Sequence, residues 1–190
     1  MPIRVDHEVR RQLVAEIVAG IIASKGLEAV TVRAVAEASG FSTRVVSHYF
    51  SGKREVLLLC YRQTALRARQ RLEAAAIACP GDVAAALDSL LPCHVQARED
   101  WLVWVSFWGM AIGDAEFSAI QCMQFRVSRE YFAILLKEEP AVLDVEGAAL
   151  HLLVSISGMA VEAAFDPDDW PAERQRLHLK ETIEMVVCRR

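Results

Sequence analysis

The sequence predicts an all-α protein of about nine helices, in which a small helix-turn-helix unit precedes a larger helical body. Apolar residues recur at helical spacing along almost all of the 190 residues, without the alternation typical of strands. No run of β-branched residues bounded by turn signals predicts a strand. Hydrophobic residues make up 54% of the chain and charged residues 24%, which supports a buried core and excludes disordered and collagen-like proteins.

The first predicted helix covers about residues 7–25. Its apolar face is predicted to consist of Leu13, Ile17 and Ile21, which recur at intervals of four residues. Gly26 follows directly, and glycine is favoured immediately after the end of a helix. We expect this apolar face to pack against the next two helices.

Two short helices with a glycine turn between them are predicted next. Thr31 is placed to cap the first, which extends to about Ser39, and Ser42 to cap the second, which extends to about Tyr49. Gly40 permits the left-handed or tight-turn conformation that joins them. The residues expected to seal this pair against the first helix are Val32, Val35, Val46 and Phe50. Such a pair predicts a helix-turn-helix, whose second helix presents side chains to the major groove of DNA.

Residues 51–190 predict six further helices. The longest begins at Ser51 and ends near Ala78, before the sequence Cys-Pro-Gly. The others are predicted at about 82–97, 99–114, 116–138, 142–165 and 171–188, with a kink at Pro92 in the first of these. The longest uncharged apolar stretches, 101–113 and 147–161, are shorter than a membrane helix and predict buried core helices. We expect a DNA-binding domain of residues 1–50, associated with the start of the fourth helix to about residue 61, and a ligand-binding and dimerisation domain of residues 51–190.

Charge is distributed unevenly along the chain. Residues 1–70 contain 11 Lys and Arg against 6 Asp and Glu, whereas residues 71–190 contain 10 against 19. A basic segment in an otherwise acidic protein indicates an anionic partner such as duplex DNA. Ordinary scatter of surface charge is the alternative.

The outward face of the helix that ends at Tyr49 is predicted to be polar. Arg44 on this face has the donor pattern that pairs with guanine O6 and N7. Lys53 and Arg54 lie in the first turn of the fourth helix, where the helix dipole disfavours cations, so a phosphate is expected to bind there. The predicted DNA contacts are Arg33, Ser42, Thr43, Arg44, Ser47, His48, Tyr49 and Lys53. The alternative is that the basic side chains are merely solvated and that Tyr49 packs.

Three tryptophans share one helix face in the body. Trp101, Trp104 and Trp108 stand at i, i+3 and i+7, and Phe107 lies close to them. These four residues predict an aromatic pocket for flat apolar molecules or for a cation held over the rings. Core packing is the alternative for each indole. The nearby acidic residues, which supply either a counter-charge or ordinary helix-end charges, are Glu99, Asp100, Asp114 and Glu116.

The last two predicted helices carry broad apolar faces that need a partner surface. We expect them to meet the same helices of a second copy in a four-helix bundle, with small residues allowing close approach. The predicted contacts are Leu150, Val154, Ser157, Gly158, Val161, Leu177, Ile183 and Val187. Packing within one chain is the alternative.

The sequence lacks the motifs of the enzyme classes considered. It contains no HExxH, no GxSxG and no glycine-rich turn from strand to helix. Its five cysteines are scattered without a CxxC pair, which argues against a zinc site and a disulfide framework. A thiol redox sensor at Cys79 and Cys93 is a weaker alternative. We therefore expect a protein that is not an enzyme and has no cofactor or metal. We also expect a cytoplasmic protein without a membrane partner, since its charged amino terminus does not resemble a secretion signal.

Residues 7–61 resemble the DNA-binding domain of the TetR family of bacterial transcriptional regulators. The residues that carry this resemblance are Thr31, Val35, Ala36, Gly40, Ser42, His48, Tyr49, Phe50, Lys53 and Leu57. The resemblance implies a homodimeric repressor that binds a palindromic operator and is released by a small-molecule effector. The chain departs from the commonest family pattern at Thr43, Arg44 and Ser47, so the operator sequence cannot be taken from a relative.

A second resemblance concerns the effector. Residues 47–50, together with Trp104, Phe107, Trp108 and Asp114, are similar to the choline-responsive, BetI-like repressors of the same family. This resemblance implies a quaternary ammonium effector such as choline. A regulator of multidrug efflux that binds planar hydrophobic or cationic drugs is the alternative.

Overall fold

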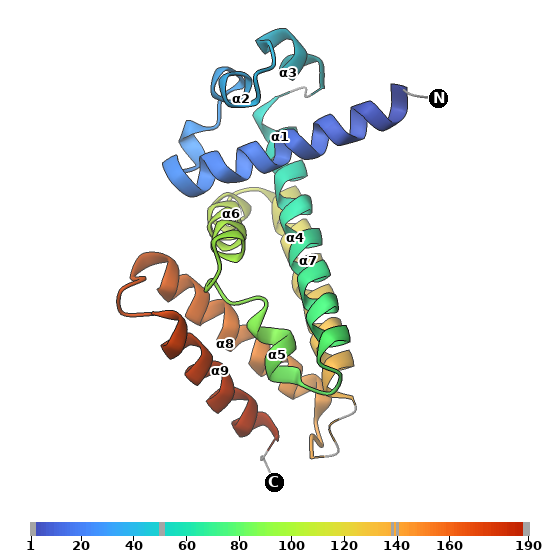
Figure 1. Cartoon of the computed structure of the whole chain (residues 1–190), viewed down its shortest axis with the longest axis vertical. Helices are drawn as coiled ribbons and strands as arrows, with labels where there is room; N and C mark the ends of the chain where they lie inside the picture. Colours follow the sequence, from blue (N-terminus) through green and yellow to red (C-terminus); the bar gives the residue numbers. More distant parts are fainter. Residues whose placement is uncertain (1–2, 50–51, 138, 140, 188–190) are drawn as a thin grey trace.

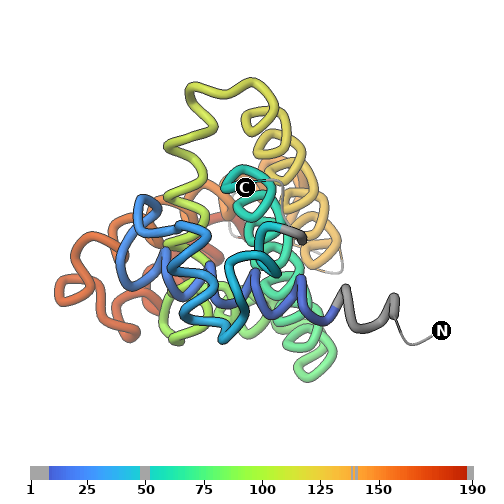
Figure 2. The backbone as a smooth tube through the Cα atoms, turned by 90° about the horizontal axis from the view of Figure 1, so that it is seen from above, coloured from blue at the N-terminus to red at the C-terminus, as the bar shows by residue number. Residues whose placement is uncertain are grey.

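The computed structural model describes residues 3–49, 52–137, 139 and 141–187, and within them the chain forms nine α-helices and one short 3₁₀ helix, with no strand. The α-helices are α1 (Ile3–Lys25), α2 (Val32–Ser39), α3 (Thr43–Tyr49), α4 (Lys53–Ala78), α5 (Val83–Asp88), α6 (Val95–Ala111), α7 (Ala115–Leu136), α8 (Val145–Phe165) and α9 (Ala172–Val187). Helices α1–α3 gather at one end of the molecule, and α4 leads from that end into the body formed by α5–α9 (Figure 1). Viewed from that end, α1–α3 lie in front of the body (Figure 2). This arrangement confirms the predicted all-helical fold.

Local capping explains the turn between α2 and α3. The Thr31 hydroxyl accepts a hydrogen bond from the backbone N–H of Ala34 at 3.1 Å, and the Ser42 hydroxyl accepts one from Val45 at 3.2 Å. Gly40 between them has a φ of 70°, in the left-handed region that favours glycine. The predicted caps and the glycine turn are therefore confirmed.

The core of this end of the molecule uses only part of the predicted face of α1: Ile21 is buried in it, but the other buried positions are shifted by one residue. Val14, Val18 and Ile22 are buried there together with Val35 and Val46. Leu13 and Val32, which were predicted to seal this core, are about 40% exposed, and Ile17 is only half-buried. A shift of one residue rotates a helix face by about 100°, which accounts for the error. Phe50, the last member of the predicted seal, lies outside the described residues.

α4 belongs to both parts of the molecule. Near its start, Val56, Leu57 and Cys60 are buried in the core shared with α1–α3. Near its end, Leu72 is buried in the core of the body. One continuous helix of 26 residues, about 39 Å long, therefore connects the two cores.

The region before α6 differs from the predicted helix of residues 82–97. α5 ends at Asp88, and the backbone N–H groups of Leu90 and Leu91 bond to carbonyls only three residues earlier. Pro92 follows, and because it has no N–H group it cannot continue a helix. α6 then starts at Val95, four residues before the predicted start at residue 99. The proline ends this segment rather than kinking it.

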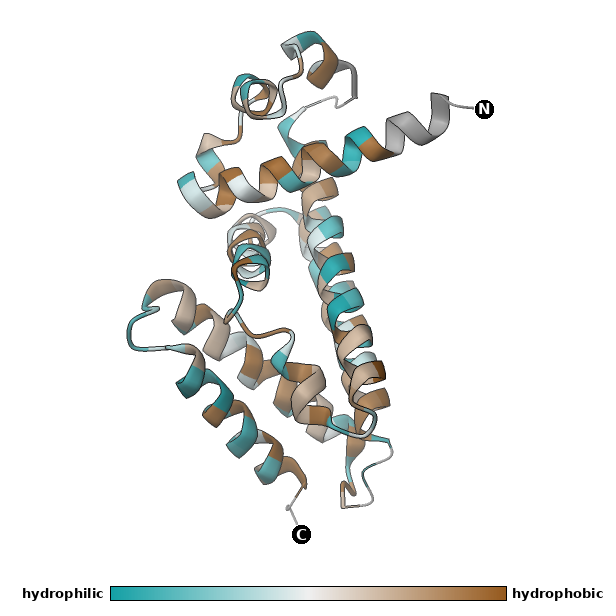
Figure 3. Ribbon diagram, viewed as in Figure 1, coloured by the Kyte–Doolittle hydropathy of each residue, from teal (hydrophilic) through white to brown (hydrophobic). Residues whose placement is uncertain are grey.

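α8 is the central helix of the body. By length and composition it is apolar enough to cross a membrane. Seven of its residues are nevertheless buried inside the protein, where it packs on α6, α7 and α9. Hydrophobic colour runs along most of α8, whereas α9 alternates between hydrophilic and hydrophobic positions (Figure 3).

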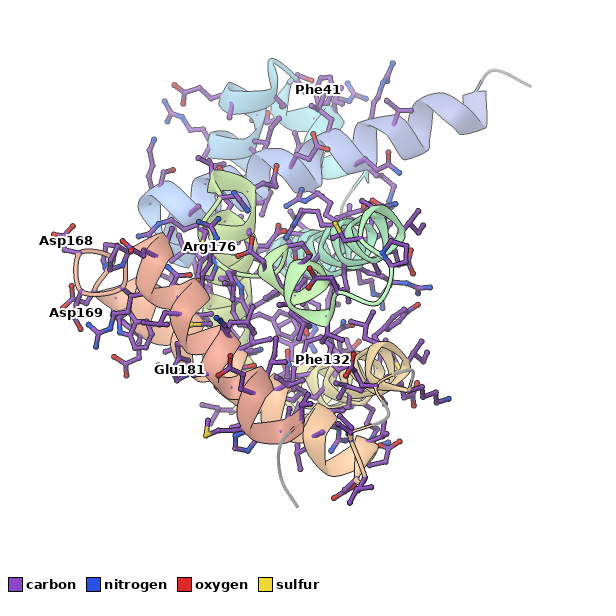
Figure 4. All side chains as sticks on the ribbon, turned by 60° about the horizontal axis from the view of Figure 1, so that its bottom comes forward. Phe41, Phe132, Asp168, Asp169, Arg176 and Glu181 are labelled. Atoms are coloured by element: carbon purple, nitrogen blue, oxygen red, sulfur yellow. The ribbon has the colours of Figure 1, made fainter. Side chains whose placement is uncertain are left out.

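At the outer edge, the turn between α8 and α9 carries exposed Asp168 and Asp169, whereas Phe132 of α7 is buried (Figure 4).

Candidate functional site

α3 is buried on one face and exposes polar side chains on the other. Val46 is 1% exposed and packs in the core with α1. Thr43, Arg44 and Ser47 are exposed, and Arg44 makes no ion pair with another described side chain. His48 and Tyr49 lie in α3, but their side chains fall outside the described part of the chain. α3 can thus present three polar side chains to an external partner without disturbing the core.

The two cations at the start of α4 have different surroundings. Lys53 is exposed and has one loose ion pair, at 3.6 Å from a carboxylate oxygen of exposed Glu28. Arg54 instead donates hydrogen bonds to Asp114 and, at 2.7 Å, to Glu116 at the start of α7. These bonds raise the pKa of Arg54 and lower the pKa of Asp114. Lys53 is therefore available to bind a phosphate, and so is exposed Arg33 on α2. Arg54, the other cation expected to bind a phosphate, instead holds α4 to α7.

A cavity of about 280 Å³ lies between α4, α6, α7 and α8. Trp101, Trp104 and Trp108 line it, so the structure brings three of the four predicted aromatic residues to its wall. Phe107 lies elsewhere: it is 3% exposed and stacks on Tyr61 with ring centroids 3.9 Å apart. The volume lies just below the usual range for small-molecule sites, about 300 to 1,000 Å³.

Four further aromatic residues line the cavity from helices distant in sequence. They are Tyr61 of α4 and Phe125, Tyr131 and Phe132 of α7. None of them was singled out from the sequence, because none shows the repeated helical spacing that marks the tryptophans. Only the packing of α4 and α7 against α6 brings them together.

Two of the three lining indoles are anchored by hydrogen bonds within the protein. The Trp101 indole N–H donates to the Leu90 carbonyl at 2.7 Å, and the Trp104 indole N–H donates to the buried Thr64 hydroxyl at 3.0 Å. The Trp108 indole N–H is buried and has no hydrogen-bond partner in the described part of the chain. Trp101 contacts both other rings edge to face. The tryptophans therefore serve core packing and cavity wall at the same time.

The acidic residues near the tryptophans in sequence do not line the cavity. Asp100 is fully buried and forms ion pairs with Arg67 and with Arg71, the second at 2.8 Å. Burial raises the pKa of Asp100, and the two guanidinium groups oppose that rise. Asp114 and Glu116 bind Arg54, and Glu99 accepts a hydrogen bond from Gln96 at 3.2 Å. The counter-charge expected for a cationic ligand is thus engaged elsewhere.

An apolar face of α8 and α9 remains uncovered. Leu150, Val154 and Leu177 are 44%, 63% and 56% exposed, and Gly158 beside them is exposed as well. The other predicted contacts are partly buried in the chain itself: Ser157, Val161, Ile183 and Val187. Met185 and Phe165, which the sequence analysis did not single out, are also exposed.

Cys60 and Cys93 lack the lowered pKa of a reactive thiol, whereas Cys79 and Cys122 are exposed. Burial raises the pKa of Cys60 to about 12 and also raises the pKa of Cys93, the opposite of the activation that a redox-sensing thiol needs. The Cys93 thiol contacts the Gln175 side-chain oxygen at 3.3 Å. Within the described ranges, no three His, Cys, Asp or Glu side chains are grouped to hold a metal ion. Cys188 lies outside those ranges.

Comparison with known proteins assigns both parts of the chain. Residues 19–60 match the model of the bacterial regulatory proteins of the tetR family, and residues 81–187 match the C-terminal domain of the BetI-type transcriptional repressors. The HTH-type transcriptional regulator PksA of Bacillus subtilis (strain 168) is 27% identical over 98% of this chain and 94% of its own length. The HTH-type transcriptional regulator BetI of Vibrio campbellii is 23% identical over 93% of this chain and 92% of its own length.

Solved structures show the same fold over nearly the whole chain. A transcriptional regulator from Rhodococcus sp. Rha1 superposes with a TM-score of 0.84 at 24% identity, covering 93% of this chain and 95% of that chain. A regulator from Saccharomonospora viridis, solved in complex with choline, superposes with a TM-score of 0.82 at 20% identity, covering 93% and 96%. The chain therefore belongs to the tetR family of bacterial regulatory proteins and carries the C-terminal domain of the BetI-type transcriptional repressors.

Proposed function

We propose that the protein is a homodimeric transcriptional repressor that binds a palindromic operator through α3 and leaves it when a small molecule enters the cavity. One observation carries the DNA-binding part of the proposal. α3 buries Val46 and exposes Thr43, Arg44 and Ser47 on the opposite face, the arrangement that a recognition helix needs to reach base edges.

The proposed contacts divide into base reading and phosphate binding. Arg44 reads a guanine through its bidentate donors, and Ser42, Thr43, Ser47 and His48 lie beside it. The remaining proposed contacts, Arg33, Tyr49 and Lys53, bind phosphates and set the register of the domain on the duplex. This contact set needs no part of the body, which is consistent with the body's acidic composition.

Dimerisation is proposed at the uncovered face of α8 and α9. Leu150, Val154 and Leu177 are large apolar side chains on neighbouring helices, and exposed Gly158 permits close approach of a second helix. A two-fold pairing of this face makes a self-complementary contact, as a palindromic operator requires. The partly buried residues of the predicted set, Ser157, Val161, Ile183 and Val187, would flank that contact.

The proposed effector site is the cavity, with an apolar body of the ligand held against Trp104 and Trp108. A quaternary ammonium compound such as choline is supported by the aromatic wall and by the choline complex of the Saccharomonospora viridis regulator. A planar hydrophobic molecule is supported by the same aromatic faces. α4 couples the sites in this proposal, because it contributes Leu57 to the core beneath α3 and Tyr61 to the cavity wall.

Binding to the promoter region of the protein's own gene, measured by fluorescence anisotropy at several salt concentrations, tests the DNA-binding proposal. Arg44→Ala should cost about 1 to 3 kcal/mol on the preferred sequence and relax specificity. Lys53→Ala should weaken all sequences alike, and Arg174→Ala in α9 should change nothing. If the protein shows no salt-dependent, sequence-selective binding, the repressor proposal fails.

Tryptophan fluorescence tests the effector site, since three of the four tryptophans line the cavity. A saturable change with choline that also releases the operator would support the quaternary ammonium class. A response to planar hydrophobic compounds and none to choline would remove it in favour of the drug-binding alternative.

A further inference from the structure

The wall of the cavity carries positive charge. Arg62 and Arg69 are its charged residues, and no aspartate or glutamate is found among the described residues that line it. α4, which supplies both arginines, contains six basic and two acidic residues. The chain from residue 71 onward is acidic as a whole, so this basic wall is a local feature. An anion entering the cavity is attracted, and a cation meets repulsion.

Arg62 differs from the arginines that follow it on α4. Arg69 forms an ion pair with Glu73 at 2.8 Å, and the two arginines beside Asp100 are paired with its carboxylate. Arg62 has no hydrogen bond or ion pair to any other described side chain, although it lines the cavity. Its charge is therefore available to a ligand.

Two other side chains that line the cavity carry hydrogen-bond donors without a partner among the described residues. Gln121 is 8% exposed and lines the cavity, and its side-chain oxygen accepts a hydrogen bond from the Tyr61 hydroxyl. Its amide nitrogen has no partner in the part of the chain that the structure describes. Trp108 also lines the cavity, and its buried indole N–H has no hydrogen-bond partner among the described residues. The Gln121 amide can therefore donate to an acceptor oxygen of a ligand without giving up a hydrogen bond within the protein.

We infer that the cavity binds a small monocarboxylate with an apolar or aromatic body, whose carboxylate pairs with Arg62 and accepts a hydrogen bond from the Gln121 amide. The body of the ligand lies against Trp104, Trp108 and Phe125. This inference rests on the proposed function, because it takes the cavity as the effector site. It specifies the charge of the ligand, which the aromatic side chains alone do not determine. A carboxylate gains from a charged hydrogen bond here, whereas an ammonium group finds no free carboxylate.

The test compares three probes that share one skeleton and differ in charge: 3-phenylpropanoate, 3-phenylpropan-1-ol and 3-phenylpropylammonium, with choline as a fourth. Binding to the full-length protein is measured by tryptophan fluorescence and by calorimetry. The propanoate should bind about tenfold more tightly than the ammonium. Tighter binding of the ammonium or of choline, or no binding of the propanoate at millimolar concentration, would overturn the inference.

Arg62→Gln should remove most of the preference for the carboxylate and leave the affinity for the neutral alcohol unchanged. Arg62 is exposed, so the variant should fold, and circular dichroism checks this. Arg126→Gln on α7, an exposed arginine that does not line the cavity, is the matched control and should keep the preference. An unchanged ratio of carboxylate to ammonium affinity in Arg62→Gln would overturn the assignment of Arg62.

Operator release is measured separately, so the two ideas can fail independently. Binding of the propanoate that leaves the protein–DNA complex intact would support the inference and contradict release by this site. Release by choline without any response to the propanoate would support the proposed function and overturn the inference.

Discussion

Asp100 is the residue whose environment departs most from that of an ordinary surface carboxylate. It is fully buried, and its partners Arg67 and Arg71 have side chains only 20% and 25% exposed. These ion pairs hold α6 against α4. The charge is compensated only while both helices stay in place, so Asp100 contributes to the geometry of the cavity without touching a ligand.

Asp100→Asn should lower the free energy of unfolding by about 2 to 3 kcal/mol. Removing one partner of a buried ion pair leaves the other charges uncompensated, and the partial exposure of the arginines places the loss at or below the low end of the usual range. Urea denaturation measures it. Glu73→Gln, which breaks the exposed pair with Arg69, is the control and should have little effect. Equal losses in the two variants would contradict this account.

Gly40 and Gly20 offer a matched test of backbone conformation. A Cβ atom added at either position meets no atom within 4 Å, but Gly40 has a φ of 70° whereas Gly20 lies within α1. Gly40→Ala should therefore destabilise the protein by about 1 to 2 kcal/mol. Gly20→Ala should stabilise it by about 0.5 to 1 kcal/mol, because alanine favours a helix. Chemical denaturation would show opposite signs, and a loss in both variants would refute the explanation from φ.

At the scale of elements, helical spacing and capping residues predicted most of the fold. The caps at Thr31 and Ser42 could be found because capping depends on side chains within three residues of the helix start. The face of α1 was partly misplaced because Leu13 and Val14 are both apolar, and only contact with α2, α4 and α6 selects one of them. The break at Pro92 was underestimated because apolar residues continue on both sides of it.

The uncovered face of α8 and α9 gives a prediction about assembly. Val154→Lys places a charge at the centre of this face and should shift the protein from dimer to monomer, as measured by analytical ultracentrifugation. Ile112→Lys is the control, because Ile112 at the end of α6 is 90% exposed and lies outside that face. A dimer that persists in Val154→Lys would place the interface elsewhere.

At the scale of the whole molecule, the separation of charge predicts how DNA binding responds to salt. Three exposed basic residues per protomer, Arg33, Arg44 and Lys53, give about six charges in a dimer. The logarithm of the affinity should then fall against the logarithm of salt concentration with a slope of about −5. Lys53→Ala should flatten the slope by about 2, since it removes one charge from each protomer. A slope near zero would show that these residues do not meet phosphates.

The cavity could be predicted only in part. The three tryptophans were found because they share one helix face, a relation that the spacing of i, i+3 and i+7 contains. Tyr61 and Phe125 are separated from them by tens of residues, and nothing local links them. Asp100, Asp114 and Glu116, beside the tryptophans in sequence, were expected as a possible counter-charge, but arginines of α4 form ion pairs with all three. Charge at a wall thus depends on tertiary pairing, which short-range patterns do not contain.

The contacts between α4 and α7 share one register, with consequences for how this sequence can change over evolutionary time. Arg54 meets Asp114 and Glu116, Tyr61 meets Gln121, and the Arg69 guanidinium lies over the Tyr131 ring, always with a separation of 60 to 62 residues. A single-residue deletion inside either helix would slide it by about 1.5 Å and turn it by about 100°. Every contact on the far side of the deletion would then be lost together. We expect length changes among descendants of this chain to fall in the connections between α4 and α6 or beyond α7, and to be absent from the paired stretches themselves.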